Sequence, residues 1–236
     1  MASYGIEAAG RNAGGWPQYA YREFGRVLEL APAGAGAGRR NLVFASVGDR
    51  WALEAGLRAA AAAGRGRPFD VCVVHYGDEP GKFRDLASPG MYLERKGFKY
   101  GNFLFAYETL PALHGYDAVW LADDDIALEL SGVERMFDAL HGHGLWIAQP
   151  AYAAGSDVSH GLTARRPGQA LRFTNFVEVG APFFSRTALL AALGTFFESE
   201  TGAGLDYVWW TALGQPADKL AVVDAVPCRH PFPAAA

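Results

Sequence analysis

The sequence has few of the residues that stabilise small secreted or zinc-binding domains. Only two cysteines occur in 236 residues, Cys72 and Cys228, and they form no CxxC spacing. This pattern supports neither a disulfide framework nor a zinc knuckle. Cys72 lies inside an apolar run, which is typical of a buried, inert thiol. The residues leave a disulfide between the two cysteines open, and a soluble, reducing, cytoplasmic setting is the simplest expectation.

Charge is also scarce, and neither sign dominates. Charged residues make up 19% of the chain, with 21 basic against 25 acidic residues and a formal net charge of −4. Because half of the residues are hydrophobic, a mainly disordered chain is excluded. A weakly acidic balance lacks the basic footprint of proteins that bind nucleic acid or anionic membranes. We therefore expect no nucleic acid among the partners.

Long apolar runs and several common catalytic motifs are missing as well. No uncharged run is long enough for a transmembrane helix, and the N-terminus has no basic segment followed by an apolar one. We therefore expect neither a transmembrane segment nor a signal peptide. The sequence has no G-x-x-x-x-G-K-[ST], G-x-S-x-G or H-E-x-x-H. It also lacks a G-x-G-x-x-G over 41–48, so the usual mode of NAD binding is not expected.

A stretch rich in glycine and alanine divides the chain. Residues 31–38 (APAGAGAG) contain no large side chain and are typical of a flexible linker. We therefore predict an N-terminal extension with its linker over 1–38 and a single domain over 39–236. The extension contains one short amphipathic stretch, 21–30. The residues leave open whether it docks on the domain or pairs with a partner.

Beyond residue 39, short apolar strands alternate with helical segments. Short strands with apolar residues on both faces, separated by helices, favour a largely parallel α/β sheet, Rossmann-like in its first half. Three prolines, 227, 231 and 233, are expected to prevent regular structure after the last strand. The predicted strands are 41–47, 69–76, 91–94, 117–122, 145–149, 173–179 and 220–223. The predicted helices are 51–63, 100–110, 131–140 with Ser131 as the N-cap, 185–193 and 205–213.

Three consecutive aspartates, Asp123, Asp124 and Asp125, follow the third of the long apolar strands. In open α/β sheets, ligands bind beyond the carboxyl ends of strands. In an extended segment alternate residues face the same way, so Asp123 and Asp125 would face one point. Two carboxylates there suit an octahedral Mn²⁺ or Mg²⁺, which would neutralise charge on a diphosphate leaving group. The simpler interpretation is an acidic turn that caps the following helix.

A series of short motifs runs from about Asn41 to His230. It comprises FDV at 69–71 followed by HYG at 75–77, FRDL at 83–86, Lys99 before an aromatic helix, the three aspartates, AQPA at 148–151, FVEV at 176–179, APFFSR at 181–186, GLD at 204–206, and VVD at 222–224 ahead of a histidine. In order and spacing these motifs resemble the DUF707 family, which has a GT-A-like fold. The segment YGN at 100–102 departs from that family, whose members carry bulkier aromatics there.

The resemblance implies a GT-A glycosyltransferase and suggests roles for several residues. In such enzymes a late histidine, here His230, often completes the coordination of the metal beside Asp123 and Asp125. In inverting members a carboxylate at the place of Asp206 deprotonates the acceptor hydroxyl. Both residues have plainer interpretations, a structural histidine and an aspartate favoured by the helix dipole.

Other candidates would surround the same site. The strand-end residues Ala45, Ser46 and Asp78, with Asp123 and Asp124, would bind the donor. Lys99 would reach a diphosphate or pair with the aspartates, and Arg165 or Arg166 would clamp a phosphate. Glu178, predicted within an apolar strand, needs a partner or a cleft, which makes it an acceptor-site candidate together with His160.

These residues predict metal-dependent transfer of a sugar from a nucleoside diphosphate, with UDP as the first choice, to an unknown acceptor. Inversion rests on Asp206 alone. Two other functions stay open: a non-catalytic module of the same fold that binds a nucleotide or cation, and a hydrolase of sugar nucleotides. Asp206 and Glu178 lie beyond the metal motif and favour the transferase.

Overall fold

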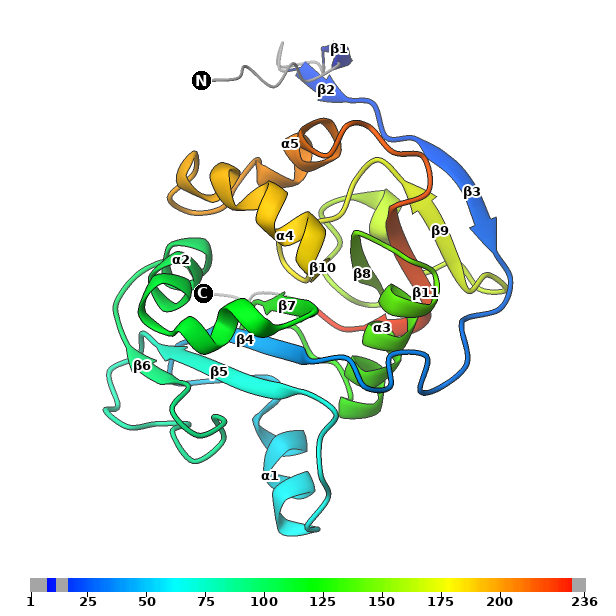
Figure 1. The fold of residues 1–236 in the computed structure, drawn as a ribbon. Helices are drawn as coiled ribbons and strands as arrows, with labels where there is room; N and C mark the ends of the chain where they lie inside the picture. The colour runs from blue at the N-terminus through cyan, green and yellow to red at the C-terminus, as the bar shows by residue number, and fades with distance from the viewer. Residues whose placement is uncertain (1–7, 12–16, 231–236) are drawn as a thin grey trace.

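The computed structural model describes residues 8–11 and 17–230 and contains a nine-stranded mixed sheet with helices on both faces (Figure 1). The strand order is β3-β9-β11-β8-β10-β7-β4-β5-β6, and all but β9 and β10 run in the same direction. A separate small sheet pairs β1 with β2. The strands are β1 (Ala8–Arg11), β2 (Pro17–Tyr19), β3 (Glu23–Val27), β4 (Asn41–Val47), β5 (Asp70–His75), β6 (Tyr92–Glu94), β7 (Ala118–Ala122), β8 (Ile147–Tyr152), β9 (Leu171–Thr174), β10 (Phe183–Ser185) and β11 (Leu220–Cys228).

The α-helices divide between the two faces of the sheet. Those on one face are α1 (Glu54–Ala62) and α3 (Leu130–Gly142). Those on the other are α2 (Lys99–Thr109), α4 (Arg186–Ala192) and α5 (Leu205–Ala212). Short 3₁₀ helices are η1 (Pro111–Gly115), η2 (Gly161–Thr163) and η3 (Leu193–Phe197).

The side chains of the parallel strands supply two cores in alternation. In β4, Val43, Ala45 and Val47 belong to the core shared with α1 and α3, whereas Leu42 and Phe44 pack toward α2 and α4. Every residue of β4 and of β7 is buried. The prediction of a largely parallel α/β sheet, with strands buried on both faces, is confirmed.

Several predicted elements differ from the structure at their ends. Strand β9 ends at Thr174, so Glu178 lies in a loop and not in a strand. Helix α3 has Glu129 as its N-cap, which places Ser131 inside the helix. Strand β11 continues to Cys228 and contains Pro227. The pairing register shifts between Val223 and Pro227, and such an irregularity is where a strand tolerates a residue without an N–H.

The second half of the N-terminal extension is part of the main sheet, because β3 forms its edge and pairs antiparallel with β9. The Gly/Ala stretch packs on α3. The Asp138 carboxylate accepts hydrogen bonds from the backbone N–H groups of Gly34 at 2.8 Å and Gly36 at 3.0 Å. A Cβ atom on Gly36 would lie 2.8 Å from His141 Cδ2, so only a glycine approaches this closely. The stretch therefore contacts the domain through backbone N–H groups rather than through large side chains, a kind of contact that its composition does not indicate.

The two cysteines are buried and free, so they form no disulfide. Burial raises the pKa of each thiol to about 12, as expected for inert residues. Within residues 8–11 and 17–230, no helix is both long enough and apolar enough to cross a bilayer.

Candidate functional site

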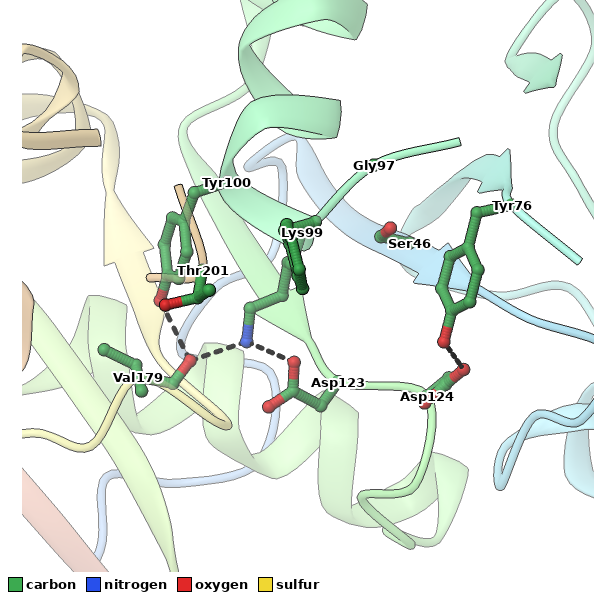
Figure 2. A pocket seen from close by; sticks show the side chains of 10 residues that line it. Ser46, Tyr76, Gly97, Lys99, Tyr100, Asp123, Asp124, Val179 and Thr201 are labelled. Carbon is green, nitrogen blue, oxygen red and sulfur yellow. Dashed lines mark hydrogen bonds and ion pairs between the residues drawn. The ribbon is translucent and has the colours of Figure 1, made fainter. Parts of the chain in front are cut away.

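Two cavities lie beyond the carboxyl ends of β4, β5 and β7. The first, of about 400 Å³, lies at the start of α2. The second, of about 1100 Å³, extends along the residues after β4 and β11. Tyr76 and Asp124 line both cavities, so the aspartate turn separates them. The first cavity is lined by Ser46, Tyr76, Gly97, Phe98, Lys99, Tyr100, Asp123, Asp124, Val179 and Thr201 (Figure 2).

The three aspartates point in different directions. Strand β7 ends at Ala122, and Asp124 and Asp125 form a turn. Asp124 Oδ2 accepts hydrogen bonds from the Gly48 N–H at 2.9 Å and the Tyr76 hydroxyl at 2.7 Å. Asp123 lines the smaller cavity and Asp125 the larger one, so the two carboxylates do not face one point as the prediction from an extended segment expected.

Asp123 forms an ion pair with Lys99, with 2.7 Å between Oδ1 and Nζ (Figure 2). The Lys99 side chain is only 8% exposed. It also donates to the carbonyl oxygens of Val179 at 2.6 Å and Gly180 at 3.2 Å. Desolvation raises the pKa of Asp123, and the Lys99 charge opposes that rise. Of the two roles expected for Lys99, the structure shows the pairing with the aspartates.

Asp125 and His230 are the described residues best placed to hold a cation. Asp125 Oδ2 lies 3.2 Å from His230 Nε2, and both residues line the larger cavity. A bridge between Ala127 and Arg229 brings the two segments together. Their side chains are 50% and 28% exposed, so both can reach a ligand.

Asp125 and His230 fit a divalent cation that takes two ligands from the protein and further ligands from phosphate oxygens. Among the described residues, no three carboxylate, imidazole or thiol groups surround one point. The protein thus offers a pair and not the predicted trio with Asp123. Mg²⁺ commonly takes one or two carboxylates and completes its octahedron with phosphate oxygens and water. Near His230, the buried Tyr152 hydroxyl lacks a hydrogen-bond partner in the described part of the chain, and a bound ligand would satisfy it.

Glu178 and Asp206 form a second, buried acidic centre. Their exposed fractions are 8% and 4%. Burial raises the pKa of Glu178 to about 7, and the charge of Asp206 adds to the rise. Burial also raises the pKa of Asp206 to about 6, against hydrogen bonds from the backbone N–H groups of Val179 and Tyr207. Both carboxylates therefore change charge near neutral pH.

The acceptor candidate His160 lies at the start of η2. The Tyr21 hydroxyl forms a hydrogen bond with its Nδ1 atom at 2.5 Å. Thr163, the last residue of η2, donates to Glu178 Oε2 at 3.4 Å. Burial lowers the pKa of His160. The loop that carries His160 thus reaches the buried acidic centre.

Some predicted site residues are not gathered here. Ser46 lines the smaller cavity, but the neighbouring Ala45 is buried in the core. Asp78 is 89% exposed and pairs with Lys96 at 2.5 Å. Arg165 donates to the Asp224 carbonyl at 3.1 Å, and Arg166 pairs with Glu23 at 2.5 Å. Both arginines are exposed, each makes a contact within the protein, and neither lines the two cavities.

Four residues of the cavity region were not predicted. Tyr76 bonds Asp124, as described above, and the fully buried Asn102 donates to Ser46 Oγ at 2.8 Å. A lone amide in an aromatic helix is the signal that could have identified Asn102. Arg50 and Arg229 line the larger cavity, and within the described residues no side-chain hydrogen bond or ion pair of either is found. Nothing in the sequence separates them from other surface arginines.

Comparison with known proteins yields structural similarity alone, since no family model and no curated protein matches the chain. GalNAc-T7, solved with UDP, GalNAc and Mn²⁺, aligns over 87% of this chain and 47% of its own, at 8% identity and a TM-score of 0.58. A mannosyltransferase from Pyrobaculum calidifontis, in complex with GDP-Man and Mn²⁺, aligns over 88% of this chain and 61% of its own, at 14% identity and a TM-score of 0.54. The chain has a GT-A-like fold.

This GT-A-like chain spans about half to three fifths of the length of those two proteins. A 4-diphosphocytidyl-2C-methyl-D-erythritol synthase from Anaerococcus prevotii also aligns, over 79% of this chain and 89% of its own, at 12% identity and a TM-score of 0.51. The fold thus occurs both in a mannosyltransferase and in a synthase. The function of this chain therefore has to be argued from its site. Membership of the DUF707 family stays a prediction.

Proposed function

We propose that the protein is a metal-dependent glycosyltransferase that moves a sugar from a nucleoside diphosphate, with UDP as the first choice, to an acceptor hydroxyl. The observation that carries this proposal is the closeness of two different acidic centres. The exposed Asp125–His230 pair suits a cation, whereas Glu178 and Asp206 are buried and titrate near neutral pH. Lys99, which pairs with Asp123, also donates to the carbonyl oxygen of Val179, the neighbour of Glu178, so both centres would serve one substrate complex.

The donor would bind across the aspartate turn. Ser46, Tyr76 and Phe98 line the smaller cavity, which would take the nucleoside. Arg50 and Arg229 line the larger cavity beside Asp125 and His230, where the diphosphate would find cationic partners. A Mn²⁺ or Mg²⁺ held by Asp125 and His230 would supply charge neutralisation for the leaving diphosphate. Two proteins with this fold were solved with UDP or GDP-Man and Mn²⁺, which supports this choice of donor and metal.

Asp206 would act as the general base toward the acceptor. Its backbone hydrogen bonds fix the carboxylate, and a pKa of about 6 leaves it ionised but basic at neutral pH. Glu178, beside it, would contact the acceptor. A hydrolase needs no buried site for an acceptor alcohol, so this second centre favours transfer.

Calorimetric titration of UDP in the presence of Mn²⁺ tests the donor site. For the wild type we expect binding that is lost in EDTA. Asp125→Ala should weaken it at least tenfold, because one of two protein ligands is removed. Glu134→Ala, on α3 and away from both cavities, should bind like the wild type.

Two results would contradict this assignment. If neither UDP, GDP nor CDP binds with Mn²⁺, no donor site exists at the aspartate turn. If UDP binds but no UDP-sugar is consumed with any acceptor, the chain is a binding module and not a transferase. Consumption of UDP-sugars by water alone would indicate a hydrolase.

A further inference from the structure

Four aromatic residues from separate parts of the chain meet beside Glu178 and Asp206. Tyr21 contacts His160 and Phe176, with ring centroids 5.8 Å and 5.1 Å apart. Tyr207, the neighbour of Asp206, contacts the same two rings at 6.0 Å and 5.5 Å. Phe176 is fully buried beneath the others, Tyr21 is 39% exposed, and His160 and Tyr207 are half-buried. We call Tyr21, His160, Phe176 and Tyr207 the aromatic wall.

The N-terminal segment that carries Tyr21 is fixed to the domain on both sides of this residue. The buried Asn175 accepts a hydrogen bond from the Arg22 N–H at 2.8 Å and donates to the Ala20 carbonyl at 2.9 Å. The Asn175 N–H donates in turn to the Arg22 carbonyl at 3.2 Å. Glu23, the next residue, pairs with Arg172 at 3.1 Å. Tyr21 is thus held between two residues that both bond Asn175, directly before β3.

The Tyr21 hydroxyl also lies within the electrostatic reach of the acidic centre. Burial, a hydrogen bond with Tyr207 and the charges of Asp206 and Glu178 all raise the pKa of Tyr21. Two phenol groups and an imidazole therefore converge next to the proposed base. Tyrosine combines a flat apolar ring with a hydrogen-bonding tip, and such surfaces bind ligands that have an apolar face and a polar edge.

We propose that the aromatic wall is the acceptor subsite, that Tyr21 of the N-terminal segment contacts the acceptor, and that the acceptor is an uncharged pyranose. A pyranose offers an apolar ring face for stacking and hydroxyl groups for Tyr21, His160 and Tyr207. Anionic sugars are disfavoured, because Glu178 and Asp206 are buried alongside and would repel a further negative charge. The role of the pyranose as an acceptor rests on the proposed function, whereas its binding to the aromatic wall can be tested without any transfer reaction.

Saturation-transfer NMR with the methyl α-pyranosides of glucose, galactose and mannose tests the proposal, with and without UDP and Mn²⁺. At least one pyranoside should bind the wild type. Loss of a stacked ring corresponds to about tenfold in affinity, so Tyr21→Ala should weaken binding by that factor. Tyr21→Phe keeps the ring and should weaken it by about two- to fivefold, the usual worth of one hydrogen bond. Leu28→Ala removes a 67% exposed side chain from the same segment and should have no effect.

Separate measurements distinguish acceptor contact from a structural role. UDP affinity and Tm of Tyr21→Phe should match those of the wild type. The proposal is overturned if no pyranoside binds the wild type, or if Tyr21→Ala and Tyr21→Phe both bind pyranosides as the wild type does. An equal loss of UDP affinity and pyranoside affinity in Tyr21→Phe would also overturn it, because that residue would then only support the fold. Failure of UDP binding in the wild type contradicts the donor site and leaves the pyranoside result to stand by itself.

Discussion

Glu178 and Asp206 are carboxylates in surroundings that oppose their ionisation. Neither side chain has a cationic partner within salt-bridge distance among the described residues, and both are over nine-tenths buried. A buried carboxylate without a cation binds its proton more tightly than in water. An ionised carboxylate buried without a cation lowers the free energy of unfolding. Carboxylates with perturbed pKa values of this kind are common at functional sites.

The pH dependence of transfer follows from the raised pKa of Asp206. A general base must be deprotonated, so kcat/KM should rise with pH through about 6 and level off above it. Asp206→Asn should lower kcat by ~10²–10⁴-fold and abolish this rise. UDP affinity, measured by calorimetry, should stay within about twofold of the wild type, since Asp206 does not line either cavity. A variant that retains the wild-type pH profile would exclude Asp206 as the base.

Glu178 makes a prediction about stability. Its folded-state pKa of about 7 exceeds its ordinary value of 4.5. Between these two values the unfolded chain releases the proton and the native protein keeps it, so stability falls as pH rises and then levels off above about pH 7. Glu178→Gln removes this loss. Urea unfolding should show the variant about 1–3 kcal/mol more stable than the wild type at pH 8 and nearly equal to it at pH 4.

Glu134→Gln, whose side chain lies on α3, provides the control for the charge change and should follow the wild type at both values of pH. If Glu178→Gln shows the same dependence of unfolding free energy on pH as the wild type, Glu178 is not a protonated residue at neutral pH, and its place in the acidic centre would need another explanation.

At the residue scale, the structure brings some of the predicted site residues together and leaves others apart. Asp125 and His230 of the predicted metal site lie 3.2 Å apart, whereas Asp123 pairs with Lys99. Ser46 and Asp78 both lie near the carboxyl ends of strands. Ser46 lines the smaller cavity, whereas Asp78 is exposed and pairs with Lys96. Strand position alone does not fix the direction of a loop side chain, because loop backbone dihedrals are not periodic.

At the element scale, several regular segments were predicted within a few residues, whereas β3 and β10 were not predicted as strands, and β9 and β11 end five residues away from their predicted ends. Apolar periodicity placed β4, β5, β7, α2 and α5 because burial on one or both faces constrains every residue in them. The errors lie where backbone groups decide the structure. The aspartates form a turn, and the 31–38 stretch packs through its N–H groups, features that side-chain patterns do not report.

Docking of the Gly/Ala stretch on α3 gives a prediction at this scale. Asp138→Ala would leave the N–H groups of the exposed Gly34 and the buried Gly36 without their acceptor. An unsatisfied buried donor costs ~1–3 kcal/mol, and we expect a loss of that size in urea unfolding. Glu134→Ala, four residues earlier on the same helix, should cost less than 0.5 kcal/mol, as is usual for surface substitutions. Equal effects of the two substitutions would show that 31–38 is not anchored.

At the scale of the whole molecule, one buried arginine joins segments that are far apart in the sequence. Arg172 of β9 is fully buried. It donates to Asp224 Oδ2 of β11 at 2.8 Å and pairs with Glu23 of β3 at 3.1 Å. It also donates to the carbonyl oxygens of Leu162 and Ala164, in the segment that follows the acceptor candidate His160. No local pattern could predict this network, because its members meet only after the sheet has formed.

Arg172→Met should therefore destabilise the protein strongly. It leaves Asp224, 1% exposed, as a buried carboxylate without its partner, a change that costs ~3–5 kcal/mol. In the double variant Arg172→Met/Asp224→Leu no charge is left stranded, so part of the lost stability should return. A double-mutant cycle from urea unfolding measures this coupling, which should exceed ~1 kcal/mol.

The same variants separate the two halves of the site. The donor cavities do not include Arg172 or Asp224, so UDP affinity of the folded double variant should equal that of the wild type. Pyranoside binding should fall, because Glu23 and the 162–164 loop lose the group that holds them near Tyr21 and His160. If pyranoside affinity is unchanged while stability falls, the network supports the sheet alone and the aromatic wall is positioned by Asn175.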